Sequence, residues 1–266
     1  EPDMWVRRLH PEDRERVLRQ FREACAAGGR FASEYRLLDR EGRVVWWRDE
    51  GRVLPGPDGK ARFVRGFVLD VTEQRLAEES LRRMRFYDQL TGLPNRVLLL
   101  NRLGRALSEA LRTSQPLALL ILAIDRFRDV TNALGHHNGE LIVRDLAARL
   151  GDALGDPDRV ARLRGDEFGV LLPDADAPFA RQVGDRILGS LERPFMVQKL
   201  PIELSASIGV AVAPEHGTEA ETLLRRADAA VQAARKKGGG ETVLYASELE
   251  PHDPSRLALL GELRRA

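Results

Sequence analysis

The sequence predicts an α/β protein in two parts, a helix with a three-stranded antiparallel sheet followed by an α/β sandwich. From Phe31, apolar and polar side chains alternate with period two, and turn residues follow at 40–42 and 55–59. Leu117–Ile124 is an unbroken apolar run, typical of a strand covered on both faces. After Arg96, helical and strand patterns alternate. The 266 residues suffice for two domains with separate cores, at roughly 100–200 residues each.

Charge and cysteine content restrict the class of protein. The 42 Lys and Arg residues nearly balance 41 Asp and Glu residues, so we expect no nucleic-acid partner, which would call for a basic excess. The single cysteine, Cys25, excludes an internal disulfide and fits a reducing, cytoplasmic compartment. The longest apolar run is far shorter than the roughly 20 residues of a membrane helix. Because the sequence begins with Glu1, we expect it to be a piece of a longer chain.

The first part, residues 1–71, contains four predicted elements. Pro11 and the acidic residues after it favour a helix start, because free backbone N–H groups and the helix dipole suit them there. Gly28 and Gly29 end this helix. Three strands are then predicted, one from Phe31 and the others over Val44–Leu54 and Phe63–Val71.

A polar helix is predicted over residues 72–87, between the two parts. Its apolar residues Ala77, Leu81 and Met84 follow a spacing of four and then three. This spacing is typical of a short parallel dimer helix, whose seam would join two copies of the chain. A plain linker helix lying on either domain explains the spacing equally well, and both interpretations stay open.

The second part begins with an amphipathic helix over Arg96–Arg112 and the apolar strand Leu117–Ile124. A helical turn and a Gly135–Gly139 corner then lead to a helix through Leu150. The remaining predicted elements are the strands Arg159–Leu163 and Phe168–Leu172, a helix over 179–191, the strand Ala206–Val212, a helix over 219–237 and the strand Val243–Tyr245.

Two adjacent carboxylates, Asp166 and Glu167, lie at the turn between two of these strands. Their repulsion is tolerable only in water or beside a cation, so the turn is either a solvated acidic turn or a cation site. The apolar strand that ends at Asp125 would finish beside such a hairpin and add backbone or carboxylate oxygens. Divalent cations that bind triphosphates need this arrangement of oxygens.

Residues 88–247 resemble a GGDEF domain. The motifs that carry the resemblance are Asp88–Arg96 (DQLTGLPNR), Ile124–Arg128 (IDRFR), Gly135-His136, Arg164–Phe168 (RGDEF), Ser207–Ala211 (SIGVA) and Ala227–Ala230 (ADAA), in the family's order. The fold it implies is that of the nucleotidyl-cyclase palm, with a central, mostly antiparallel sheet. The first 71 residues resemble the C-terminal half of a PAS sensor domain, whose first strands are missing here. The tail from 248, through Ser255–Ala266, resembles the opening helix of an EAL phosphodiesterase domain.

The GGDEF resemblance implies a diguanylate cyclase, in which two protomers join two GTP into cyclic di-GMP with loss of two diphosphates. Two divalent cations, Mg²⁺ or Mn²⁺, would bridge the phosphates. Their implied ligands here are Asp166, the backbone carbonyl of Ile124 and the neighbouring Glu167, and the two carboxylates would keep any residual catalytic role. A further metal-binding Asp of the family is Ala123 in this sequence. Asp125 matches a second acidic position, which is expected to cap the following helix.

The implied nucleotide contacts also differ from the family pattern. Arg164 replaces the first motif glycine, ahead of Gly165, and its guanidinium either binds phosphate or blocks the turn. The guanine-reading Asn and Asp are Thr131 and Glu140 here. Arg128 and Arg235 occupy the positions of two phosphate-binding lysines of the family, and Gly239 occupies the position of an arginine. Gly155 replaces the arginine of the family's product-inhibition motif, so no inhibitory site is expected.

We therefore expect a degenerate GGDEF module that binds GTP weakly or not at all and makes little cyclic di-GMP. It would pass signals from the PAS part to an EAL-like domain downstream, as a homodimer through the linker helix. Losing one such electrostatic donor typically costs about 3–4 kcal/mol of transition-state stabilisation. The alternatives are a slow diguanylate cyclase rescued by Asp125 or by one metal, and a dimerisation module that binds no nucleotide.

Overall fold

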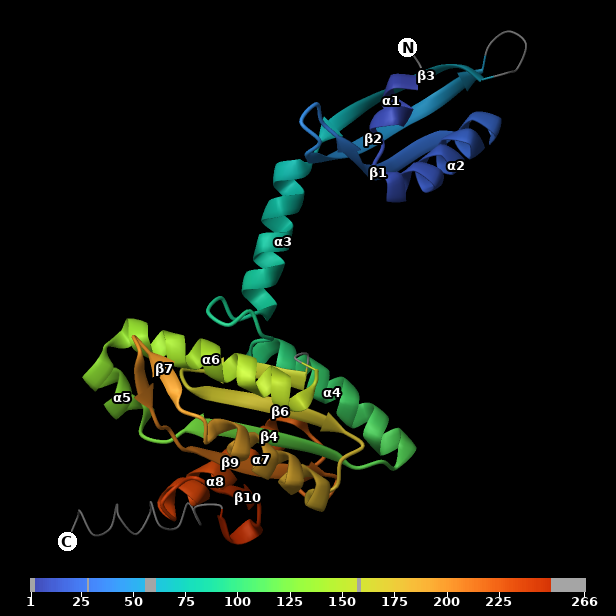
Figure 1. Cartoon of the computed structure of the whole chain (residues 1–266). Coiled ribbons are helices and arrows are strands. Elements are labelled where there is room, and N and C mark those ends of the chain that lie inside the picture. Colours follow the sequence, from blue (N-terminus) through green and yellow to red (C-terminus); the bar gives the residue numbers. More distant parts are fainter. Residues whose placement is uncertain (1–2, 28, 56–60, 157–158, 250–266) are drawn as a thin grey trace, which may run out of the picture. The chain divides into compact units, whose positions relative to one another are not determined.

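Among the described residues, a three-stranded antiparallel sheet, two helices and the first part of a third helix form the first unit of the chain, Glu1–Arg82 (Figure 1). The structure is a computed structural model that describes residues 3–27, 29–55, 61–156 and 159–249. The elements of this unit are α1 (Asp3–Arg8), α2 (Pro11–Ala27), β1 (Arg30–Leu38), β2 (Val44–Pro55) and β3 (Ala61–Asp70), with the strands in the order β1-β2-β3. The predicted helix and strands are confirmed, whereas no sequence pattern predicts α1.

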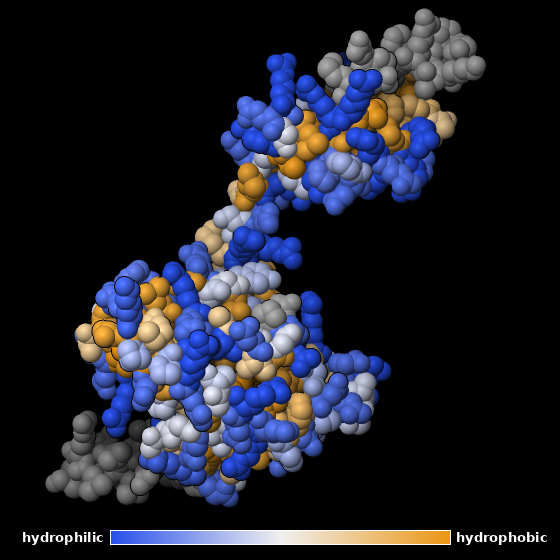
Figure 2. Space-filling view, in the orientation of Figure 1, coloured by the Kyte–Doolittle hydropathy of each residue, from blue (hydrophilic) through white to orange (hydrophobic). Residues whose placement is uncertain are grey.

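Alternation along β1 buries one face of this sheet against α2. Phe31, Tyr35 and Leu37 are buried there, as the period of two predicts. The Asp13 carboxylate on α2 accepts hydrogen bonds from the Arg36 backbone N–H and Nε, both at 2.9 Å. These bonds hold the pKa of Asp13 well below its usual range and join α2 to β1. On the edge strand β3, Phe67 is half exposed, and apolar surface is visible on this unit in Figure 2.

Helix α3 (Thr72–Phe86) continues from β3 and buries no side chain. The Thr72 hydroxyl accepts a hydrogen bond from the Trp46 N–H at 2.8 Å, so the start of α3 is attached to β2. Arg75 pairs with Glu34 on β1 and lies 5.2 Å from the ring centre of Trp46. Leu76, Leu81 and Met84 are exposed. The division into two units falls inside this helix, between Arg82 and Arg83.

The second unit is built on a five-stranded sheet in the order β10-β9-β4-β6-β5 (Figure 1). Its pairs are antiparallel except for the parallel pair of β10 with β9. The strands are β4 (Leu117–Ile124), β5 (Val160–Arg164), β6 (Glu167–Pro173), β9 (Ala206–Ala213) and β10 (Thr242–Leu244), with a separate hairpin of β7 (Phe195–Val197) and β8 (Leu200–Ile202). The sequence pattern predicts the five-stranded sheet and misses this hairpin.

Helices cover both faces of the five-stranded sheet, so every residue of β4 is buried. One face packs against α4 (Arg96–Thr113) and α8 (Ala220–Lys236), and the other packs against α6 (His136–Leu154) and α7 (Ala177–Leu191). The short α5 (Phe127–Leu134) follows β4, and the 3₁₀ turn η2 (Ser247–Leu249) follows β10. The predicted α/β sandwich is confirmed. Within the described residues, no helix is long and apolar enough to cross a membrane.

Helix α8 lies directly on β9 because Gly209 has no side chain. A Cβ at this position would lie 2.1 Å from the Ala227 carbonyl oxygen and 2.5 Å from the Val231 nitrogen, both backbone atoms of α8. Any larger residue must therefore push the helix away from the sheet. Since α8 carries Arg235 in its last turn, this close approach also fixes the position of that side chain.

We predict that Gly209→Ala lowers the free energy of unfolding by about 1–3 kcal/mol or more, because the added methyl overpacks against helix backbone that cannot move alone. The matched control is Gly189→Ala on the exposed side of α7, where a Cβ would meet no atom within 4 Å. That change should stabilise by about 0.5–1 kcal/mol, since glycine is a poor helix former. Urea denaturation of the two variants measures both effects, and equal stabilities would contradict the prediction.

Candidate functional site

The pairing of β4 with β6 and β9 brings the acidic hairpin next to the end of the central strand. Ala123 is opposite Glu167 on one side and opposite Ser207 on the other. Gly165 and Asp166 form the turn between β5 and β6, and Gly165 has a φ of +49°. The Ala123 side chain is fully buried in the apolar cluster between the sheet, α4 and α8. At this position the chain therefore offers a methyl group and no oxygen ligand.

A guanidinium lies between the two remaining oxygen groups of this site. Arg235 Nη2 donates to the Ile124 carbonyl oxygen at 2.8 Å and to Asp166 Oδ2 at 3.3 Å. The structure thus brings together the Ile124 carbonyl and Asp166, as the sequence predicts, with an arginine as their shared partner. Burial raises the pKa of Asp166, and the attraction of Arg235 does not outweigh it.

Asp125 is held by the sheet and by the loop after α8. Its Oδ1 accepts from the Ser207 hydroxyl at 2.7 Å, and its Oδ2 accepts from the Gly240 backbone N–H at 3.0 Å. A Cβ on Gly239, which has a φ of +80°, would lie 2.5 Å from this carboxylate. The N-cap residue of α5 is Arg126, which makes no side-chain cap bond. The prediction that Asp125 caps the helix is therefore wrong, and Asp125 instead joins three segments of the chain.

The second hairpin carboxylate, Glu167, is paired with Arg164. Arg164 Nε donates to Glu167 Oε2 at 2.7 Å, and its Nη2 donates to Oε1 at 3.2 Å. This bidentate pair uses both carboxylate oxygens. On α8, burial raises the pKa of Asp228, and the negative charge of Glu167 raises it further. In this structure the Arg164 guanidinium binds the hairpin itself.

The predicted guanine-reading residues lie on two neighbouring helices, α5 and α6. The Thr131 hydroxyl donates to the Arg128 carbonyl oxygen at 3.0 Å, so its one polar group already has a partner within α5. A Cβ on Gly139 would lie 2.6 Å from the Thr131 methyl, which shows how closely α5 and α6 approach here. Arg128 and Glu140 are both exposed. The three side chains thus lie on the neighbouring helices α5 and α6, and the two charged ones face solvent.

This arrangement does not fit a centre of two divalent cations. The methyl of Ala123 supplies no ligand, and the oxygens of Ile124 and Asp166 share Arg235. Glu167 is occupied by Arg164. In the part of the chain that the structure describes, no group of three or more His, Cys, Asp and Glu side chains is placed to hold a metal ion.

Arg162 connects the hairpin to the loop that precedes α4, and no sequence signal predicted this. Its Nη1 donates to Asp88 Oδ1 at 2.9 Å, and its Nη2 donates to the Gly165 carbonyl oxygen at 2.8 Å. Burial favours the neutral form of Asp88, but the bonds from Arg162 and Thr91 outweigh it and lower the pKa of Asp88. Arg162 is thus the residue that holds the turn at Gly165.

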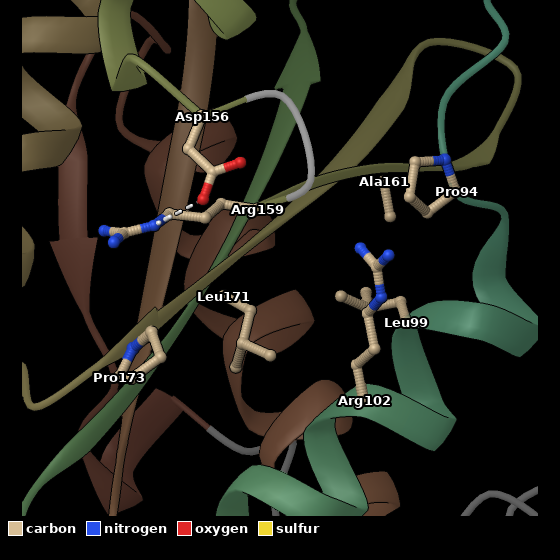
Figure 3. Close-up of a pocket in the computed structure, with 8 residues that line it drawn as sticks. All are labelled: Pro94, Leu99, Arg102, Asp156, Arg159, Ala161, Leu171 and Pro173. Carbon is tan, nitrogen blue, oxygen red and sulfur yellow. Dashed lines mark hydrogen bonds and ion pairs between the residues drawn. The ribbon is translucent and has the colours of Figure 1, made fainter. Parts of the chain in front are cut away.

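The region of the absent inhibitory motif contains a cavity of about 320 Å³. Gly155 ends α6 with a φ of +68°, a conformation that favours glycine. Figure 3 shows Asp156 paired with Arg159 at 3.3 Å, and Arg102 approaching from α4. The lining residues are Pro94, Leu99, Arg102, Asp156, Arg159, Ala161, Leu171 and Pro173.

Comparison with known families identifies both parts of the chain. Residues 85–241 match the family described as diguanylate cyclase, GGDEF domain, and residues 1–68 match the PAS fold. The chain therefore belongs to the GGDEF family, with a PAS fold ahead of the GGDEF domain. The resemblances to a GGDEF domain and to a PAS fold are confirmed. Neither match reaches the tail from residue 248, and the EAL-like residues 255–266 lie outside the described residues, so that resemblance stays a prediction.

Several proteins are similar to this chain over part of their own length. An uncharacterised protein of Sinorhizobium fredii, y4lL, is 32% identical over 98% of this chain and 32% of its own. The bifunctional diguanylate cyclase/cyclic di-GMP phosphodiesterase MucR of Pseudomonas aeruginosa is 33% identical over 71% of this chain and 28% of its own. The crystal structure of the GGDEF domain of TpbB from P. aeruginosa, at 37% identity, covers 59% of this chain and 98% of that domain with a TM-score of 0.57. The chain spans about a third of the length of the curated relatives it matches.

We predict that the Asp88–Arg162 pair contributes to the stability of the second unit. The side chains are only 23% and 14% exposed, so Asp88→Asn or Arg162→Gln should each lower the free energy of unfolding by about 1–3 kcal/mol. The double variant should lose less free energy of unfolding than the sum of the two single losses, since each single variant already removes the same interaction. Arg159→Gln is the control, because its pair with Asp156 is about half exposed and should matter little. Additive losses in urea denaturation would show that the two side chains are not coupled.

Proposed function

We propose that residues 88–247 form a degenerate GGDEF domain, with little or no diguanylate cyclase activity, that relays signals from the PAS part. GGDEF domains in general bind GTP, dimerise and use Mg²⁺. The observation that carries the proposal is the buried methyl of Ala123, opposite Glu167 in the sheet, at the position where the family has a metal-binding carboxylate. GTP, if bound, would contact Arg128, Thr131 and Glu140, the hairpin residues Arg164 and Gly165, and Arg235 on α8.

Electrostatics supports low activity. A cyclase must stabilise negative charge that develops on the transferred phosphate and the leaving diphosphate, and divalent cations supply most of that stabilisation. Without the carboxylate at 123, a cation here would keep Asp166 and the Ile124 carbonyl, both bonded to Arg235. Removing one group that stabilises this charge typically costs about 3–4 kcal/mol of transition-state stabilisation, which slows the reaction by about 10²–10³-fold.

The place of the domain in a longer chain is part of the same proposal. Residues 72–87 would be the signalling helix, and residues 248–266 would lead to an EAL-like domain. Two relatives support this: MucR carries both cyclic di-GMP activities in its name, and PdeR of Escherichia coli, 32% identical over 74% of this chain, is named a cyclic di-GMP phosphodiesterase.

A second candidate function is an active or slow diguanylate cyclase. It is favoured by TpbB of P. aeruginosa, which is named a diguanylate cyclase and is 37% identical over 65% of this chain. A rescue by Asp125 would require that its carboxylate leave the Ser207 hydroxyl and the Gly240 N–H. A nucleotide-free dimerisation module is the third candidate, and calorimetric titration with GTP distinguishes it, since it predicts no heat.

We predict that the protein incubated with GTP and Mg²⁺ or Mn²⁺ yields little or no cyclic di-GMP by chromatography. Ala123→Asp should strengthen divalent-dependent GTP binding, because it restores an anionic ligand next to Asp166. Ala123→Asn is the matched control, with the same shape and no charge. Product from the unaltered chain that disappears in Asp166→Ala would overturn the proposal. No effect of Ala123→Asp in a folded variant, either alone or combined with Arg235→Gln, would show that residue 123 is not the metal-ligand position.

We further predict that the dimer proposed through α3 depends on Leu81, which is 63% exposed at the centre of the seam. Leu81→Asn should shift the protein towards monomer in light scattering after size exclusion, since a polar residue replaces an apolar seam position. Glu79→Asn is the control, because Glu79 is exposed and lies off the seam formed by Ala77, Leu81 and Met84. Equal masses for both variants would favour the plain linker helix.

A further inference from the structure

We infer that the guanidinium of Arg235 is a built-in cation of the acidic hairpin, and that it excludes divalent ions from the Ile124 carbonyl and Asp166. The inference concerns the same site as the proposed function and rests on its assignment of these two groups as metal ligands. Besides lacking a carboxylate at residue 123, the chain supplies its own cation, Arg235, at the position that a metal ion would occupy.

The geometry allows one cation at this place and not two. A single nitrogen, Arg235 Nη2, lies 2.8 Å from the Ile124 carbonyl oxygen and 3.3 Å from Asp166 Oδ2. A divalent ion would have to bind the same two oxygens at about 2.0–2.6 Å. The volume between the oxygens is filled by the N–H group, so ion and guanidinium compete for one position.

Charge strengthens the competition. Arginine stays protonated at any pH the protein experiences, so the guanidinium cannot be removed by losing a proton. Its Nε is buried without a hydrogen-bond partner and lies 3.7 Å from Asp125 Oδ1, so the cation faces a second carboxylate. The Asp125 and Asp166 side chains are 10% and 23% exposed, which limits screening by water. A divalent ion would therefore meet a fixed positive charge in a partly dry site.

The surrounding contacts hold the arginine in place. Asp125 is fixed by the Ser207 hydroxyl and the Gly240 N–H, so it cannot follow Arg235 outward without losing both bonds. The backbone of α8 is fixed against β9 at Gly209. Displacing the guanidinium therefore means breaking its bonds to Ile124 and Asp166, while Asp125 keeps its hydrogen bonds from Ser207 and Gly240 but loses the positive charge of Arg235.

Binding of Mn²⁺ alone, followed by electron paramagnetic resonance without nucleotide, tests the inference on the full chain. The unaltered protein should show no Mn²⁺ binding that depends on Asp166. Arg235→Gln should bind Mn²⁺ at least about tenfold more tightly, because a like charge no longer opposes the ion. The gain should disappear in Arg235→Gln/Asp166→Asn. Lys236→Gln is the matched control, since it removes the same charge from the neighbouring exposed position.

Two outcomes would overturn the inference. One is Asp166-dependent Mn²⁺ binding by the unaltered chain as tight as in Arg235→Gln. The other is that Arg235→Gln, shown by circular dichroism to be folded, gains no more Mn²⁺ affinity than Lys236→Gln does. If Arg235→Gln does not fold, Arg235→Met is measured in its place. The proposed function is tested separately, because production of cyclic di-GMP by the unaltered chain would contradict it. An inactive protein that binds Mn²⁺ through Asp166 would contradict only the role of Arg235.

Discussion

The position of β4 between β6 and β9 determines everything that the candidate site can do. Because both neighbours are antiparallel to β4, the end of β4 meets the start of β6 and the start of β9 at one edge of the sheet. Ala123, Glu167 and Ser207 consequently share one level of the sheet. Alternation along the strand then sends the Ala123 methyl towards α4 and α8, while the Ile124 side chain joins the core on the opposite face.

At this edge, the carboxylates of Asp125, Asp166 and Glu167 all have partners within the chain. Asp166 and Glu167 would repel each other if both were left without partners, and two arginines from different elements neutralise them. Asp125 faces Arg235 at 3.7 Å and accepts hydrogen bonds from the neutral donors of Ser207 and Gly240. A hairpin that needs an external cation for this purpose would gain from binding metal, whereas this one has its positive charges already in place.

The periodic features of the sequence were enough to predict the fold, and local spacing predicted part of the site. The apolar run 117–124 is typical of a strand covered on both faces, and its end was expected beside the hairpin; both expectations are confirmed. Contacts between long side chains depend on register and helix position, which periodicity does not encode. The bonds of Arg162 to Asp88 and Gly165, 74 and three residues away, are of this kind. The bonds of Arg235 to both Ile124 and Asp166 likewise depend on the close approach of α8 to β9 at Gly209. The strands β7 and β8 were missed because three residues each are too few to show a period.

Hydrogen bonds connect the hairpin to the end of the helix that precedes its domain. Asn95 donates from its backbone N–H to the Phe86 carbonyl and from its side chain to the Arg85 carbonyl, both at 2.8 Å, at the end of α3. The backbone N–H of Arg162 donates to the Pro94 carbonyl, and its side chain joins Asp88 to the hairpin turn. The last turn of α3 and the hairpin turn are therefore joined by hydrogen bonds through one short loop. None of these bonds involves Ala123 or the oxygens that Arg235 binds, so the connection between the end of α3 and the hairpin does not depend on the groups assigned to metal binding.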